Sequence, residues 1–170
     1  MRPGRDFFKQ DVLTVAPLLL GKYIVTLNNG ITEKFIITEV EAYRGEEDLA
    51  CHASKGRTKR NGIMYAEGGH IYVYFIYGMY WMLNIVTGEK DNPQAVLIRG
   101  INRFDGPGKL TRRLKIDGSF YGEDLVASNR IWIENNMARG EIVTGPRIGI
   151  DYAGDYWKNM PWRYNLLLQK

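Results

Sequence analysis

Residues 70–88, HIYVYFIYGMYWMLNIVTG, form a run of β-branched and aromatic residues with Gly78 near its middle. Such a run is typical of β-strands, and a central glycine permits a reversal of the chain. We therefore expect a hairpin or a bent pair of strands here. Because alternate side chains of a strand face opposite sides, the six aromatic residues of the run cannot all point into one core. Some of these rings must face a cleft, a partner or solvent, unless the strands are buried on both faces.

The composition indicates one soluble domain over residues 1–170 with a surplus of basic residues. A chain with 45% hydrophobic and 25% charged residues can bury one sizeable core. The net charge of +4 fits a polyanionic partner, although many basic proteins bind nothing anionic. The one cysteine, Cys51, excludes an internal disulfide framework and a multi-cysteine zinc site, and two histidines leave little for any other metal site.

The N-terminal residues MRPGRDFFKQ contain no apolar segment of the kind that directs secretion, and the cluster VAPLLLG is too short to span a bilayer. We therefore expect no membrane association and an intracellular location. This would be the cytoplasm, in association with the nucleoid, in a bacterium, and the nucleus in a eukaryote.

Strand patterns dominate the rest of the chain, with short helical segments between them. Asp11 can cap a helix over residues 12–20 that ends at Gly21, although Pro17 should bend or shorten it. The turn Asn28-Asn29-Gly30 separates two strands. The predicted strands are 22–28, 34–41, 95–101, RIWIEN, EIVTGPRIGID and WRYNLLL, and a short helix is predicted over 106–116. This mixture predicts the α+β class.

The stretch 37–52, ITEVEAYRGEEDLACH, begins as an apolar, β-branched strand and ends as an acidic loop. Glu41 lies at the predicted end of this strand, where a buried carboxylate could serve as an acid or base. Alternatively, Glu39 and Glu41 could both point outward from a half-buried strand. Arg99 lies among apolar residues in the strand 95–101, where a charge is costly unless it is paired or lines a site.

Six basic residues could contact a phosphate backbone. Three lie in the loop 44–61, and three are spaced i, i+3 and i+4 on the predicted helix 106–116, so that they share one face. These phosphate-contact candidates are Arg57, Lys59, Arg60, Lys109, Arg112 and Arg113. Both groups could equally belong to a solvated surface.

Four blocks of sequence carry most of the chemistry-bearing residues. They are EVEAYRGEEDLACHAS, IYVYFIYGMYWMLNIV, VLIRG with the downstream GPGKL, and GPRIGIDYAGDYW with PWRY. In content and order they resemble the alkyladenine DNA glycosylases, also called mammalian-type 3-methyladenine DNA glycosylases, and the resemblance covers nearly the whole chain. It implies a single compact α+β domain with a curved antiparallel β-sheet, flanking helices and a protruding β-hairpin that intercalates into DNA.

The resemblance also implies an activity. Members of that family are monofunctional glycosylases of base excision repair. They flip a damaged purine out of double-stranded DNA and hydrolyse its N-glycosidic bond, which leaves an abasic site. Family substrates include 3-methyladenine, 7-methylguanine, hypoxanthine and ethenoadenine. The family uses no cofactor and no metal, and we expect a monomer whose partner is double-stranded DNA containing damaged purines.

The residues that the resemblance assigns to hydrolysis come from three separate blocks. Glu41 matches the glutamate that holds and deprotonates the attacking water, and Arg99 matches an arginine that shares this water. Ile148 matches a position whose backbone carbonyl completes the surroundings of the water. Tyr77 matches the hairpin side chain that fills the gap left in the DNA stack.

Another set of residues matches the family's base-binding positions. Tyr43 matches the aromatic residue on one face of the flipped base, and His52 and Tyr74 match those on the other face. The resemblance also implies that the main chain around Ala50 and His52 contacts the edge of the base. Asn84 matches the residue that crowds the 2-amino group of guanine.

Some expectations remain open at this point. Arg99 should keep Glu41 ionised, since a nearby opposite charge favours the charged form, whereas Glu39 is expected to be structural. The loop between His52 and Tyr74 is slightly shorter than the mammalian pattern, so its individual DNA contacts are not carried over.

Two other classes of protein remain possible. A non-enzymatic nucleic-acid binding protein would have no use for a buried carboxylate, and a small-molecule hydrolase would leave Tyr77 unexplained.

Overall fold

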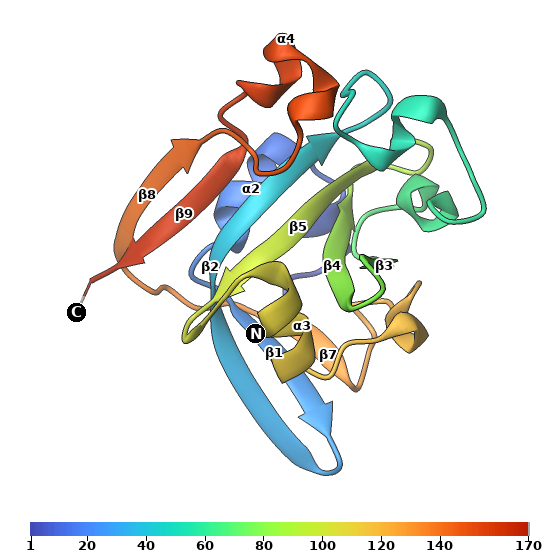
Figure 1. Cartoon of the computed structure of the whole chain (residues 1–170). Helices are drawn as coiled ribbons and strands as arrows, with labels where there is room; N and C mark the ends of the chain where they lie inside the picture. Colours follow the sequence, from blue (N-terminus) through green and yellow to red (C-terminus); the bar gives the residue numbers. More distant parts are fainter. Residues whose placement is uncertain (170) are drawn as a thin grey trace.

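The computed structural model describes residues 1–169. Its strands are β1 (Tyr23–Asn28), β2 (Ile31–Arg44), β3 (Ile71–Ile76), β4 (Tyr80–Thr87), β5 (Gln94–Ile101), β6 (Phe104–Asp105), β7 (Ile131–Glu134), β8 (Gly140–Gly145) and β9 (Arg163–Leu168). Within the described range, these nine strands form one antiparallel sheet, with the order β3–β4–β5–β2–β1–β7 across its main path (Figure 1). The strand β6 pairs with β5, and β9 joins β8 to β2. The expected α+β fold with an antiparallel sheet is confirmed.

The helices are short and lie between strands. They are α1 (Arg5–Phe8), α2 (Val12–Leu19), α3 (Pro107–Arg113) and α4 (Asp155–Lys158), with 3₁₀ turns η1 (His52–Lys55), η2 (Gly62–Tyr65), η3 (Gly118–Phe120) and η4 (Asp151–Ala153). The predicted cap of α2 is confirmed, because the Asp11 carboxylate accepts a hydrogen bond from the Leu13 N–H. Pro17 lies inside α2 without ending it. In the described part of the chain, no helix has the length and apolarity needed to cross a membrane.

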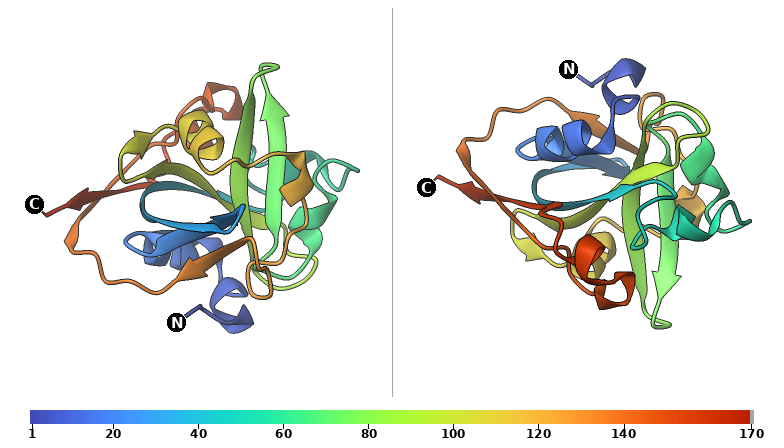
Figure 2. Two further views of the ribbon diagram at one scale, coloured as in Figure 1. Left: turned by 90° about the horizontal axis from the view of Figure 1, so that it is seen from below. Right: turned by 90° about the horizontal axis from the view of Figure 1, so that it is seen from above.

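One face of the central sheet forms the hydrophobic core. Successive side chains of a strand point to opposite faces, and on this face Val40, Ile98 and Ile85 are buried together with the apolar residues of α2. The views in Figure 1 and Figure 2 place α2 on this side of the sheet and α3 on the other side. Because each fully buried aliphatic side chain contributes about 1.5–3 kcal/mol, this packing holds the strands rigidly.

The opposite face of the same strands carries a row of residues that includes Asn84 and Glu41 of the predicted site. In the register of the sheet, Asn84 of β4 lies between Tyr72 of β3 and Leu97 of β5. Leu97 in turn lies beside Glu41 of β2. The row therefore crosses four strands whose other face is packed in the core, and a site built on it has a fixed framework.

The strand β2 extends further than the sequence predicts. Its residues Ala42, Tyr43 and Arg44 continue the pairing with β5, so Glu41 lies inside the strand and not at its end. Neighbouring strands flank Glu41 on both sides, with β5 on one side and β9 on the other. The position of its backbone is fixed as a result.

The strands β3 and β4 form the predicted hairpin. Tyr77, Gly78 and Met79 connect the paired residues Ile76 and Tyr80. The φ angles of Tyr77 and Gly78 are 52° and 64°, and positive φ at both central residues is what a type I′ turn requires. The Met79 N–H closes the turn on the Ile76 carbonyl at 3.1 Å. The hairpin protrudes from the rest of the molecule (Figure 2), and Tyr77 at its tip is 86% exposed. The expected protruding hairpin is confirmed.

Candidate active site

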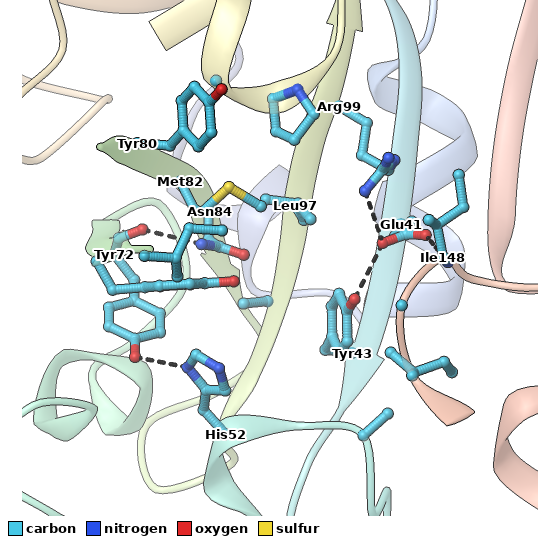
Figure 3. A pocket seen from close by; sticks show the side chains of 18 of the residues that line it. Glu41, Tyr43, His52, Tyr72, Tyr80, Met82, Asn84, Leu97, Arg99 and Ile148 are labelled. Atoms are coloured by element: carbon cyan, nitrogen blue, oxygen red, sulfur yellow. Dashed lines mark hydrogen bonds and ion pairs between the residues drawn. The ribbon is translucent and has the colours of Figure 1, made fainter. Parts of the chain in front are cut away.

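A cavity of about 520 Å³ lies over the face of the sheet that carries Asn84, Leu97 and Glu41 (Figure 3). This volume is within the range of roughly 300–1,000 Å³ that is typical of small-molecule sites. The cavity brings together all nine predicted catalytic, base-binding and intercalating residues, which are Glu41, Tyr43, Ala50, His52, Tyr74, Tyr77, Asn84, Arg99 and Ile148. Residues from five separate segments of the chain therefore meet at one place.

Glu41 is a fully buried carboxylate in the wall of this cavity. Its Oε1 accepts a hydrogen bond from the Tyr43 hydroxyl at 3.0 Å, and its Oε2 accepts one from the Ile148 N–H at 2.6 Å. The Nη1 atom of Arg99 lies 3.6 Å from Oε1. A carboxylate can accept roughly four hydrogen bonds. These contacts therefore leave room for one more donor, such as a water molecule.

Burial raises the pKa of Glu41 above its ordinary value, while Arg99, the Ile148 N–H and the Tyr43 hydroxyl oppose this rise. The expectation that Arg99 keeps Glu41 ionised therefore describes only one of two opposing effects. The loss of hydration raises the pKa of Glu41 by more than the attraction of the guanidinium lowers it. A carboxylate with a raised pKa binds a proton more readily than a free one. Glu41 is thus suited to accept a proton from a water molecule near neutral pH.

Aromatic rings line the part of the cavity that faces Glu41. Tyr43 stands across the cavity from His52 and Tyr72 (Figure 3). The ring centroids of His52 and Tyr74 lie 4.5 Å apart, and a hydrogen bond of 2.8 Å joins His52 Nδ1 to the Tyr72 hydroxyl. The space between Tyr43 and the other rings is therefore suited to a flat aromatic ligand.

Burial against its neighbours lowers the pKa of His52 to about 4, and the guanidinium of Arg60 acts in the same direction. His52 is nevertheless an exposed residue, at the open side of the cavity, so solvent weakens this effect. Both observations agree that the ring is neutral at neutral pH, since an exposed imidazole also titrates near 6.5. A neutral imidazole can stack against a cationic ring without charge repulsion.

Two other contacts fix the floor and the edge of the cavity. Asn84 is buried, and its Nδ2 donates a hydrogen bond to the Tyr72 carbonyl at 3.2 Å. At Ala50, the N–H donates to Asp48 Oδ1 at 3.1 Å, and the carbonyl accepts from the Tyr152 hydroxyl at 3.2 Å. The main chain that the resemblance assigns to the base edge is therefore held from both sides.

The sequence reasoning missed a buried ion pair behind Tyr43. Asp48 and Arg147 have no exposed side-chain surface, and their two hydrogen bonds measure 2.6 and 2.9 Å. The Arg147 guanidinium also donates to the Ala42 carbonyl and lies 4.9 Å from the centre of the Tyr43 ring. In the sequence, Asp48 is one of several acids in a predicted loop. Nothing local in the sequence indicates that a residue about a hundred positions later pairs with it.

The six phosphate-contact candidates differ in their surroundings. Lys109 lines the cavity, and Arg57, Lys59, Arg60 and Arg112 are exposed. Arg113 instead makes two hydrogen bonds to Glu33 and lies 5.2 Å from the ring of Phe35. Because a phosphate would have to compete with this carboxylate, Arg113 is the weakest candidate of the six.

Comparison with known proteins agrees with this geometry. A family model described as methylpurine-DNA glycosylase matches residues 6–106 and 102–169. A relative from Borrelia garinii, provisionally named a 3-methyladenine DNA glycosylase, is 43% identical over 94% of this chain and 93% of its own length. Relatives with the same provisional name from Desulfitobacterium hafniense and Methanocella arvoryzae are each 42% identical, over 97% and 94% of this chain and 95% and 90% of their own lengths. The chain therefore belongs to the methylpurine-DNA glycosylase family.

Proposed function

We propose that this protein is a monofunctional DNA glycosylase that flips damaged purines out of double-stranded DNA and hydrolyses their N-glycosidic bond. One observation carries the proposal: the buried Glu41, paired with Arg99, faces a ring-lined cavity that lies beside the protruding tip at Tyr77. Membership of the family and the names of the relatives support 3-methyladenine as a substrate. The cavity chemistry extends this to other purines with a damaged or altered ring.

The cavity and the hairpin have complementary tasks in this proposal. A purine inside a duplex is out of reach of Glu41, so its nucleotide must leave the stack, at a cost of a few kcal/mol that is smallest for damaged bases. Tyr77 fills the gap and slows the return of the base. The flipped purine stacks between Tyr43 and the rings of His52 and Tyr74, and such stacking contributes about 1–3 kcal/mol per base.

Hydrolysis uses the free hydrogen-bonding capacity of Glu41. A water molecule donates a proton to its carboxylate, and the water oxygen bonds to C1′ of the sugar while the bond from C1′ to the purine nitrogen breaks. Positive charge develops on the sugar as the purine departs, and the fixed carboxylate stabilises it. A cationic purine such as 7-methylguanine leaves with the electron pair of the broken bond and needs no added proton, whereas hypoxanthine must gain one.

Asn84 is the proposed specificity residue, because it occupies the cavity floor beside Leu97. We expect Asn84→Ser to release undamaged guanine above background, since the shorter side chain leaves room for the 2-amino group. The measurement is guanine release from undamaged duplex, quantified by mass spectrometry. Asn136→Ser is the matched control, because it also removes an amide that donates to a carbonyl, here that of Gly21, outside the cavity. Equal guanine release by both variants would contradict the role of Asn84.

Tyr77 is expected to matter for duplex DNA and not for folding. Replacing it by Ala should slow excision from duplex by about ten- to a hundredfold, the equivalent of one lost stacking contact, while the melting temperature stays unchanged because the side chain is 86% exposed. Met137→Ala, at a position that is 93% exposed, serves as the control and should keep full activity. Full duplex activity in Tyr77→Ala would contradict the wedge.

The proposed function is tested by one assay on the wild-type protein. Duplexes that contain a single 7-methylguanine, hypoxanthine or ethenoadenine are incubated with the protein and then treated with alkali. The proposal predicts release of the free base and strand breaks that form only after the alkali, as expected for an abasic site left by a monofunctional enzyme. Intact strands for all three lesions, despite binding, would favour a non-enzymatic binding protein.

A further inference from the structure

Glu39 provides a second carboxylate within reach of Arg99. Its Oε1 lies 3.4 Å from Arg99 Nε and also 3.4 Å from Nη1 of Arg163. The other end of the Arg99 guanidinium, Nη1, lies 3.6 Å from Glu41. The side chains of Glu39 and Arg99 are 17% and 14% exposed, so little solvent screens this contact. Arg99 thus lies between two carboxylates of the same strand, at ion-pair distance from both.

An irregularity in the sheet makes this arrangement possible. Val40 pairs with Ile98, but Glu39 pairs with Gly100, which leaves Arg99 as an extra residue in β5. Bulges of this kind redirect side chains and are common beside active sites. Gly100 lets the strands approach, because a Cβ at this position would lie only 3.1 Å from the Cβ of Glu39. A larger residue would require the backbone or side chain of Glu39 to shift by a few tenths of an ångström.

The contacts of Glu39 lead back to Glu41 by a second route. Arg163, its other partner, donates a hydrogen bond from Nε to the Pro146 carbonyl at 2.8 Å. Two residues later, the Ile148 N–H donates to Glu41. Arg163 therefore ties the loop that carries Ile148 to the same carboxylate that holds Arg99.

We propose that Glu39 is a positioning residue for base excision, which holds the guanidinium of Arg99 against Glu41 and, through Arg163, steadies the loop that carries Ile148. The inference rests on the proposed function. It replaces the sequence expectation that Glu39 is merely structural, because the contacts of Glu39 lead to the reacting carboxylate and not into the hydrophobic core.

Glu39 also balances the charge around Glu41. The charged and titratable groups that face Glu41 are Arg99, Arg147, Tyr43, Tyr74 and Tyr152, and Glu39 faces Arg99 and Arg163. Neutralising Glu39 leaves the positive charge of Arg99 to Glu41 alone, which favours the ionised form of Glu41. The loss of activity in acid should then begin at a lower pH.

The test compares Glu39→Gln, which keeps the shape and removes the charge, with Glu39→Asp, which keeps the charge and withdraws it from Arg99. Single-turnover release of 7-methylguanine from duplex is measured as a function of pH. In the pH–rate profile of Glu39→Gln, we expect the acidic limb to lie about half a pH unit or more below that of the wild type. Glu39→Asp should keep the limb of the wild type and lose rate about tenfold.

The control is Glu123→Gln, which removes a carboxylate paired with Arg130 at 2.8 Å, outside the cavity. It should change neither the limb nor the rate. A Glu39→Gln limb that coincides with the wild type, or full rate in Glu39→Asp, overturns the proposal. Thermal unfolding shows whether each variant is folded. If Glu39→Gln does not fold, the test depends on Glu39→Asp alone. A folded Glu39→Asp with a reduced rate of base release then supports the proposal, and one with the wild-type rate overturns it. An inactive wild type would instead overturn the proposed function.

Discussion

Replacing Glu41 by Gln should lower the rate of base release by about a thousandfold or more, while binding of lesion-containing duplex persists. General base catalysis alone typically contributes about 10²–10⁴-fold, and Gln also removes the negative charge that stabilises the developing positive charge on the sugar. The cavity shape is preserved, because the amide oxygen of Gln can still accept the hydrogen bond from the Ile148 N–H, while its amide NH₂ can donate to the Tyr43 hydroxyl oxygen. Single-turnover kinetics and a duplex-binding titration provide the measurement.

The same substitution should not destabilise the protein at pH 7. The pKa of Glu41 is raised in the folded state. The protonated carboxyl group of Glu41 therefore contributes its full stabilisation at pH values below the pKa of Glu41 in the unfolded chain. This stabilisation is lost as the pH rises through the pKa of Glu41 in the folded protein. At neutral pH the ionised carboxylate thus carries a cost that Gln lacks, and the melting temperature should be equal or higher. Glu123→Gln again serves as the control for activity. Wild-type excision rates in Glu41→Gln would remove Glu41 from catalysis.

Replacing Asp48 by Ala should lower the free energy of unfolding by about 3–5 kcal/mol, the cost of leaving one partner of a buried ion pair uncompensated. The Asp48 carboxylate pairs with Arg147 and also accepts hydrogen bonds from the N–H groups of Arg44 and Ala50. Its loss would release the loop that carries His52 as well as the guanidinium behind Tyr43. Urea unfolding at neutral pH measures the effect.

A surface ion pair provides the comparison for Asp48. Asp155 pairs with Lys158 at 3.0 Å, but its side chain is 90% exposed. Asp155→Ala should therefore change the free energy of unfolding by no more than about 0.5 kcal/mol. The double variant Asp48→Ala, Arg147→Met should recover part of the lost stability, because it also removes the uncompensated charge. A loss below about 1 kcal/mol in Asp48→Ala would show that this pair does not hold the site together.

The parts of the fold that could be predicted from the sequence depend on neighbouring residues. The cap at Asp11 and the turn at Tyr77–Gly78 are set within a few positions of the chain, and both agree with the prediction. The end of β2 could not be located in this way. Its last residues pair with residues of β5 that lie fifty or more positions later, so tertiary pairing and not local preference extends the strand.

The residues of the candidate site are predicted by a resemblance to a known family, and the structure adds the contacts that set their charge and orientation. The raised pKa of Glu41 results from burial by several segments, which no local pattern reveals. The bulge at Arg99 depends on the register between β2 and β5, and it explains why Glu39 reaches the same guanidinium as Glu41. Tyr72 looked like one aromatic residue among several in the hairpin, but its hydroxyl orients His52.

The most direct test of the central claim is a crystal structure of Glu41→Gln bound to a duplex that contains one hypoxanthine. Our account predicts that the hypoxanthine lies outside the helix, between Tyr43 and the rings of His52 and Tyr74, with Tyr77 in the gap and C1′ one water molecule away from residue 41. A hypoxanthine that remains stacked in the duplex, with the cavity turned away from the DNA, would contradict the account.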